Sequence, residues 1–219
     1  MPGPMIETLC LLLAGLCALA YLALTGRAPG LARSIVKTAS VALLALAALL
    51  AQAPPLLAPA LALCALGDWF LSRPGDRAFM AGIGAFAAGH LIYAALFLTH
   101  PAADPQALAQ APQLWIGAAL AGFGIVVAAM LAPRAGALRG PVLAYVPIIL
   151  GMGIAALALP AAGSLALAFP AALAFIASDL VLAIDRFMLP AGHPARRIAP
   201  YAVWPLYWGA QAGFLAVFT

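Results

Sequence analysis

The chain has 219 residues, of which 67% are hydrophobic and only 7% are charged, and its mean hydropathy is +1.12. A soluble domain carries about 25% charged residues, so no water-soluble fold of this size can bury so much apolar side chain. Soluble function classes are therefore excluded, and the composition predicts an integral membrane protein. The net charge of +4 does not indicate nucleic-acid binding, because in a membrane protein the placement of bases matters more than their sum.

Clusters of proline, glycine and charge divide the chain into eight apolar segments, each close to the roughly 20 residues that a spanning helix needs. We therefore expect an all-α bundle of eight transmembrane helices that forms a single integral membrane domain over residues 1–219. The longest connection, 99–112, leaves no room for a large soluble domain. The expected helices are 6–25, 35–52, 55–73, 78–99, 113–132, 140–159, 163–188 and 199–218.

The basic residues predict how these helices are oriented. All ten Lys and Arg residues lie in or beside the first, third, fifth and seventh connections, which this division places on one side of the membrane. The positive-inside rule makes that side cytoplasmic, with both termini outside. Glu7 precedes the first apolar run and Arg27 is the first base, which is the reverse of a signal peptide, so we expect the first helix to be retained. The Arg-, Ala- and Pro-rich composition is typical of a GC-rich bacterial genome, and the expected location is the bacterial inner membrane.

Two aspartates lie inside predicted helices, where an ionisable side chain is costly and indicates a functional site. Asp68 lies five residues before Arg73, and Asp179 lies seven residues before Arg186. Both helices run toward the cytoplasm, so the two carboxyl groups should lie at similar depth, about 7–11 Å inside the cytoplasmic helix ends. The aspartates are 111 residues apart, each in the third helix of a four-helix half, which indicates a 4+4 parallel repeat.

His90 and Gln211 are the polar residues expected nearer the middle of the membrane. Tyr93 follows His90 by three residues and Tyr207 precedes Gln211 by four, so each pair shares one face of its helix. Ordinary structural roles stay open for the two aspartates, each of which could cap a neighbouring helix or pair with Lys37 or an arginine. A site with His, Gln and Tyr near two carboxyl groups is the functional alternative.

Several chemistries lack their residues in this chain. A serine hydrolase usually shows G-x-S-x-G, which is absent. A zinc hydrolase commonly needs several histidines, and only His90 is intramembrane. The stretch "GIGAFAAG" (82–89) has small residues at helix-packing spacing and indicates a close helix contact rather than a phosphate loop. Two carboxyl groups remain, one kept protonated as general acid and one ionised to activate water, which suits acid-labile ether bonds.

Four segments of the chain resemble a known family. "LGDWFL" (66–71), "GAFAAGHLIYAALF" (84–97), "FIASDLVLAIDRF" (175–187) and "YWGAQAGFL" (207–215) look like signature segments of the YhhN-like lysoplasmalogenase family of eight-helix membrane proteins. The resemblance covers essentially the whole chain in the same order. The family tends to show Lys-Pro at the start of the second helix, whereas this chain has Lys37-Thr38, which makes a site role for Lys37 less secure.

The resemblance implies hydrolysis of the vinyl-ether bond of lysoplasmalogens to a fatty aldehyde and glycerophospho-ethanolamine or -choline. Protonation of the alkene would give an oxocarbenium ion that water captures. Asp68 and Asp179 would be the catalytic residues, in roles that the sequence does not divide between them. Lys37 would face the phosphate, and the residues expected to position substrate and water are His90, Tyr93, Ser178, Tyr207 and Gln211. We expect no metal and no organic cofactor, and a lysophospholipid and membrane lipid as partners, with no nucleic acid and no obligate protein partner.

Two other functions use the same residues. In a proton- or cation-coupled transporter, Asp68 and Asp179 would carry protons or bind a cation, and spans broken at matching positions of the two halves would be expected. Pro170 and Pro205 are candidate breaks in the second half, while the first half has only Pro59. A structural or regulatory membrane subunit would tolerate loss of both carboxyl groups with little effect beyond stability.

Overall fold

The structure, a computed structural model, describes residues 4–219, which form eight α-helices and three short 3-10 helices and include no strand. Residues 1–3 of the predicted domain range lie outside the described residues. The prediction of an all-helical bundle with eight helices is confirmed, and each predicted range overlaps one helix over most of its length. The α-helices are α1 (Pro4–Leu24), α2 (Leu31–Leu50), α3 (Leu57–Leu71), α4 (Asp76–Thr99), α5 (Gln113–Leu131), α6 (Arg139–Ala156), α7 (Ala168–Phe187) and α8 (Ala195–Phe218).

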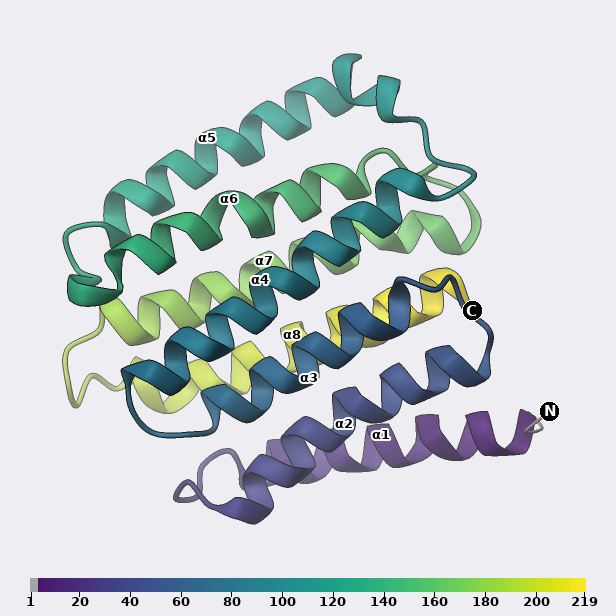
Figure 1. Cartoon of the computed structure of the whole chain (residues 1–219). Coiled ribbons are helices and arrows are strands. Elements are labelled where there is room, and N and C mark those ends of the chain that lie inside the picture. The colour runs from purple at the N-terminus through teal and green to yellow at the C-terminus, as the bar shows by residue number, and fades with distance from the viewer. Residues whose placement is uncertain (1–3) are drawn as a thin grey trace.

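The helices run side by side and alternate in direction (Figure 1). α1 and α2 lie at one flank and α5 at the other, where it packs against α6. The loops α1–α2, α3–α4, α5–α6 and α7–α8 gather at one end of the bundle, which we call the basic end because all ten Lys and Arg residues lie in or next to these loops. α1 begins and α8 ends at the opposite end. The cytoplasmic orientation of the basic end and the 4+4 repeat stay predictions.

Six of the eight helices are long and apolar enough to cross a membrane by themselves. α3 has only 15 residues, and α8 combines its apolar residues with Tyr, Trp, Pro and Gln side chains; neither is among the six. α3 packs against α2 and α4, and α8 packs against α7 and also contacts α2 and α3 (Figure 1). A helix in this position can be shorter or more polar, because its polar groups find partners inside the bundle.

The α3–α4 turn follows from its sequence. Ser72 caps α3 by donating its hydroxyl to the carbonyl of Asp68 at 2.7 Å. Pro74 disfavours helical backbone at the preceding residue, and Gly75 adopts a φ of +95°, which glycine reaches without strain. α4 then begins at Asp76. This turn places Asp68 one helical turn from the basic end.

α7 and α8 continue through the prolines that were candidate breaks. Pro170 lies in the first turn of α7, where its missing N–H breaks no helical hydrogen bond. Pro205 lies inside α8, and the helix runs from Ala195 to Phe218 without interruption. The broken helices expected of a transporter are therefore absent at these two positions.

α3 and α4 approach each other closely at glycines, as the "GIGAFAAG" stretch predicts. A Cβ atom built on Gly82 would lie 2.7 Å from Leu71 Cδ2, and one on Gly89 would lie 3.0 Å from Cys64 Sγ and 3.2 Å from the Ala60 carbonyl oxygen. On α3, a Cβ on Gly67 would lie 2.6 Å from the Phe86 ring. The close helix contact is confirmed, and it keeps Asp68 on α3 within reach of the bundle interior.

Replacing Gly89 with leucine should destabilise the bundle, because the new side chain meets the backbone of α3, which cannot rotate away. Forced overpacking of this kind costs about 1–3 kcal/mol or more. Gly84 is the matched control on the same helix, since a Cβ there has no atom within 4 Å. We expect thermal unfolding in detergent to show a lower Tm for Gly89→Leu and an unchanged Tm for Gly84→Leu. Equal Tm values for the two variants would contradict this packing.

Candidate functional site

A cavity of about 280 Å³ lies inside the bundle, and each of the eight helices contributes at least one lining residue. Both Asp68 on α3 and Asp179 on α7 line it. The lining residues lie mostly in the half of the bundle nearest the basic end, and they include Ile149, Leu150 and Ile176 near the middle of α6 and α7. Two carboxyl groups that are far apart in sequence therefore face one space, and their common depth in the membrane stays a prediction.

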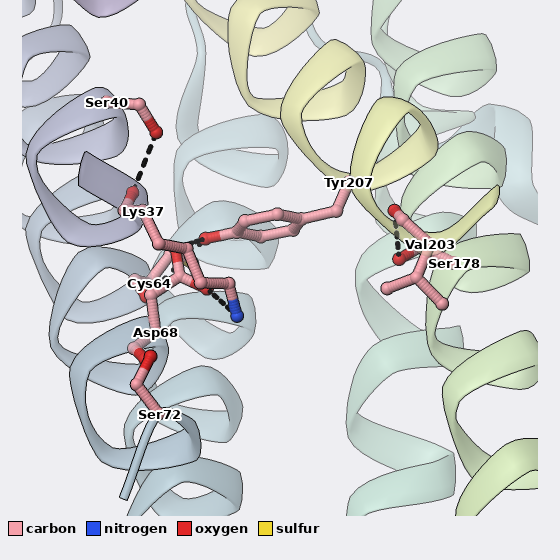
Figure 2. Close-up of polar contacts among 8 residues, drawn as sticks. All are labelled: Lys37, Ser40, Cys64, Asp68, Ser72, Ser178, Val203 and Tyr207. Carbon is pink, nitrogen blue, oxygen red and sulfur yellow. Dashed lines mark hydrogen bonds and ion pairs between the residues drawn. The ribbon is translucent and has the colours of Figure 1, made fainter. Parts of the chain in front are cut away.

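Asp68 is 1% exposed and has a partner on each carboxyl oxygen. Lys37 Nζ of α2 lies 2.9 Å from Oδ1, and the Tyr207 hydroxyl of α8 donates to Oδ2 at 2.6 Å. Figure 2 shows the lysine and the tyrosine converging on the aspartate from two different helices. This ion pair is one of the alternatives that the sequence left open. It occupies Lys37 Nζ, which was expected to face a phosphate.

Asp179 has a different environment from Asp68. It is half-buried, and the Tyr145 hydroxyl of α6 donates a short hydrogen bond to its Oδ2. Among residues 4–219, no lysine, arginine or histidine nitrogen lies within 4.0 Å of its carboxyl oxygens. One carboxyl group of the cavity thus has an ammonium partner, while the other has a phenol.

Ser178 and Tyr207, two of the predicted positioning residues, also line the cavity. The hydroxyl of Tyr207 is bound to Asp68, and the hydroxyl of Ser178 donates to the Val203 carbonyl oxygen at 3.0 Å. Figure 2 shows the Ser178–Val203 bond apart from the Asp68 cluster, joining α7 to α8. The contact of Ser178 in this structure is therefore structural.

His90, Tyr93 and Gln211 are fully buried and are not among the residues lining the cavity. The Tyr93 hydroxyl donates to Gln211 Oε1 at 2.6 Å. The His90 ring centroid lies 4.5 Å from that of Phe175 and 5.5 Å from that of Tyr145. These three residues form a polar layer behind the cavity wall. The hydroxyls bond across helices, Tyr93 to Gln211 and Tyr207 to Asp68, rather than within the same-helix pairs that spacing suggested.

The polar cavity residues that the sequence did not predict include Tyr21, Arg33, Tyr145 and Asp185. Tyr145 is the most consequential, because its hydroxyl binds Asp179. The available signal was a tyrosine inside the apolar segment "PVLAYVPIIL". Spacing along one helix indicates a polar site only where a tyrosine lies near an ionisable or amide residue, and Tyr145 has no such residue within four positions.

The described residues of the site do not include a set of metal ligands. Within residues 4–219 no three side chains of His, Cys, Asp or Glu lie close enough together to hold an ion. His90, which an Asp-Asp-His site would require, is not among the residues lining the cavity. The groups that face the cavity are instead suited to proton transfer, with carboxyl and phenol oxygens beside an apolar interior.

Comparison with known proteins identifies the family of the chain. The model of the YhhN family matches residues 32–218, which include every helix except α1. A search of curated proteins and a search of solved structures each found no match. Because the family match covers nearly the whole chain, this helical membrane protein belongs to the YhhN family.

Proposed function

We propose that the protein hydrolyses the vinyl-ether bond of lysoplasmalogens, releasing a fatty aldehyde and glycerophospho-ethanolamine or -choline. The observation that carries the proposal is the pair of aspartates, Asp68 and Asp179, on one cavity whose inner part is apolar. A lysolipid places its ether bond just below its headgroup and its chain toward the membrane centre. The cavity has a matching order, since its charged residues lie toward the basic end and its lining near the middle of α6 and α7 is apolar.

Asp179 is the proton donor in this proposal. No cation neutralises it among the described residues, and an isolated carboxylate in an apolar site costs several kcal/mol, so the neutral acid is the favoured form. Its proton passes to the alkene carbon remote from the ether oxygen. The C=C bond breaks its π pair to form the new C–H bond, and an oxocarbenium ion remains at the other carbon.

Asp68 is the group that guides water. Lys37 keeps it ionised, and its negative charge stabilises the oxocarbenium ion. Water adds to the cationic carbon and gives a proton to Asp68, which produces a hemiacetal. On collapse, Asp179 takes the hemiacetal hydroxyl proton and Asp68 returns its proton to the departing glycerol oxygen. Both carboxyl groups are then restored, so the cycle needs only water.

Asp68→Asn and Asp179→Asn should each lower aldehyde release from a lysoplasmalogen by about a hundredfold or more, the usual effect of losing a general acid or base. The measurement is aldehyde formation by purified protein in detergent, with and without a chelator; activity should persist in chelator. Asp76→Asn is the matched control, because Asp76 is exposed and pairs with Arg186 away from the cavity.

Asp68→Asn alone would leave the Lys37 ammonium buried without its partner and could destabilise the fold. The double variant Lys37→Met/Asp68→Asn removes both charges, so a loss of its activity reports on catalysis rather than on folding. The proposal predicts that this double variant keeps the wild-type Tm within a few degrees and stays inactive. Wild-type protein that is inert on vinyl-ether lysolipids would contradict the proposed reaction, and proton-coupled transport in liposomes would then be the function to test.

Loss of the hydroxyl of Tyr145 or Tyr207, which bind the two carboxyl groups, should lower the turnover rate more than it weakens substrate binding. Tyr145→Phe removes the hydrogen bond to Asp179, and Tyr207→Phe removes the one to Asp68. A hydrogen bond to a charged group contributes about 1.5–3 kcal/mol, so we expect kcat to fall about tenfold or more with little change in KM. Tyr201→Phe, an exposed tyrosine on α8, is the control. A change confined to KM would show that the phenols contact substrate instead.

The apolar part of the cavity should accommodate the alkenyl chain. Val127 of α5 lines the cavity and is 8% exposed, whereas its neighbour Val126 is 57% exposed on the outer face. Val127→Phe should shorten the space and lower the ratio of kcat/KM for long-chain over short-chain substrates about tenfold, the cost of a clash of about 1–3 kcal/mol. Val126→Phe should leave the ratio unchanged. An equal effect of both variants would place the chain elsewhere.

A further inference from the structure

Arg33 occupies the entrance of the cavity at the basic end. It lies in the first turn of α2, one helical turn before Lys37, and it is half-buried among the lining residues. Its guanidinium carbon lies 5.4 Å from the centroid of the Tyr21 ring, and Nη1 donates to the Arg27 carbonyl oxygen at 2.9 Å. That bond uses one of the five N–H donors of a guanidinium. The side chain is therefore held at the cavity, with donors remaining for a ligand.

The charges around the cavity single out Arg33. Three carboxyl groups line it, on Asp68, Asp179 and Asp185. Asp68 pairs with Lys37, and Asp185 lies 3.4 Å from Arg196 Nε while its carbonyl accepts a second bond from Arg196 at 2.7 Å. Among residues 4–219, no carboxyl oxygen lies within 4.0 Å of Arg33. Arg33 is therefore the cavity cation that an external anion can neutralise.

The depth of Arg33 matches one part of the proposed substrate. Residues three or four apart on a helix have Cβ atoms about 5–6 Å apart, so Arg33 lies one step farther toward the basic end than the Lys37–Asp68 pair. A lysophospholipid bound with its ether at the aspartates has its phosphate displaced from them in the same direction. A guanidinium presents a planar fork that matches two phosphate oxygens.

We propose that Arg33 binds a phosphate group, that of the lysolipid headgroup, and thereby sets how deep the ether bond enters the cavity. This inference rests on the proposed function. It also moves the phosphate-binding role that the sequence suggested for Lys37 to the residue one turn away, because Lys37 Nζ is already paired with Asp68.

The test compares two substrates with the same alkenyl chain, 1-alkenyl-glycerophosphoethanolamine and the phosphate-free 1-alkenylglycerol. Arg33→Gln should raise KM for the phospholipid about tenfold, equivalent to about 1.4 kcal/mol, and leave KM for the alkenylglycerol unchanged. Arg33→Lys should recover part of the loss because it keeps the charge. Arg139→Gln is the matched control, since Arg139 is an exposed arginine at the same end that does not line the cavity.

Two results would overturn the proposal. If Arg33→Gln leaves KM for the phospholipid unchanged, Arg33 does not bind the phosphate. If it raises KM for both substrates equally, the residue acts on the shape of the site, through its bond to the α1–α2 loop.

A binding measurement keeps this inference separate from the proposed reaction. The probe is the saturated alkyl-ether lysophosphoethanolamine, which has no vinyl-ether bond to cleave, and its binding to protein in nanodiscs can be followed by tryptophan fluorescence because Trp204 lines the cavity. Weaker binding to Arg33→Gln than to wild type supports the phosphate site even if no aldehyde is ever released. Equal binding to both contradicts it.

Inorganic phosphate distinguishes the source of the phosphate group. If millimolar inorganic phosphate displaces the alkyl-ether lipid from wild-type protein, Arg33 also binds the free anion. If it does not, while lipid binding still depends on Arg33, the phosphate must be carried into the site by the lipid. Both results require a phosphate contact at Arg33.

Discussion

The ion pair between Lys37 and Asp68 is the interaction on which the cavity depends. Each charge comes from a different helix, and the Tyr207 hydroxyl of a third helix donates a hydrogen bond to the second carboxylate oxygen. Removing one partner of a buried pair leaves an uncompensated charge and costs about 3–5 kcal/mol. α2, α3 and α8 are therefore held in one relative position, and that position forms the polar wall opposite Asp179.

The two aspartates acquire different properties because their partners differ. Asp68 pairs with the ammonium of Lys37, whereas Asp179 accepts a hydrogen bond from the hydroxyl of Tyr145. Two carboxyl groups in equal environments would compete for the same protonation state. The asymmetry comes from Lys37, which lies close to Asp68 and has no counterpart near Asp179 among the described residues.

Much of this architecture was predictable from the sequence, because membrane helices are recognised by the length of their apolar segments and by the polar clusters between these segments. Pro, Gly and charge clusters located all eight helices, and "GIGAFAAG" indicated the close α3–α4 contact. That Asp68 and Asp179 belong to one site was predicted from their similar distances to Arg73 and Arg186, and both line the same cavity. Each of these inferences needs only local spacing along a helix.

The direction in which each helix face points was not predictable in the same way. Spacing shows that His90 and Tyr93 share a face, but not that this face turns toward α8, where Tyr93 meets Gln211. Tyr145 was missed because a neutral tyrosine in an apolar helix gives no charge signal, although the hydroxyl has a specific partner on α7. These contacts depend on helix rotation, which is set by packing between helices distant in sequence.

The polar layer of His90, Tyr93 and Gln211 behind the cavity wall has contacts that orient helices. Tyr207 holds Asp68 from α8, and Gln211, one turn farther along the same helix, is held by Tyr93 from α4. A buried amide in a bundle costs free energy unless it is hydrogen-bonded, so the Tyr93–Gln211 bond favours one rotation of α8 against α4. That rotation points Tyr207 at Asp68. His90 packs against the rings of Phe175 and Tyr145, and the Tyr145 hydroxyl binds Asp179. Three residues that the sequence placed at the substrate, His90, Tyr93 and Gln211, are therefore buried in the protein interior in this geometry and do not line the cavity.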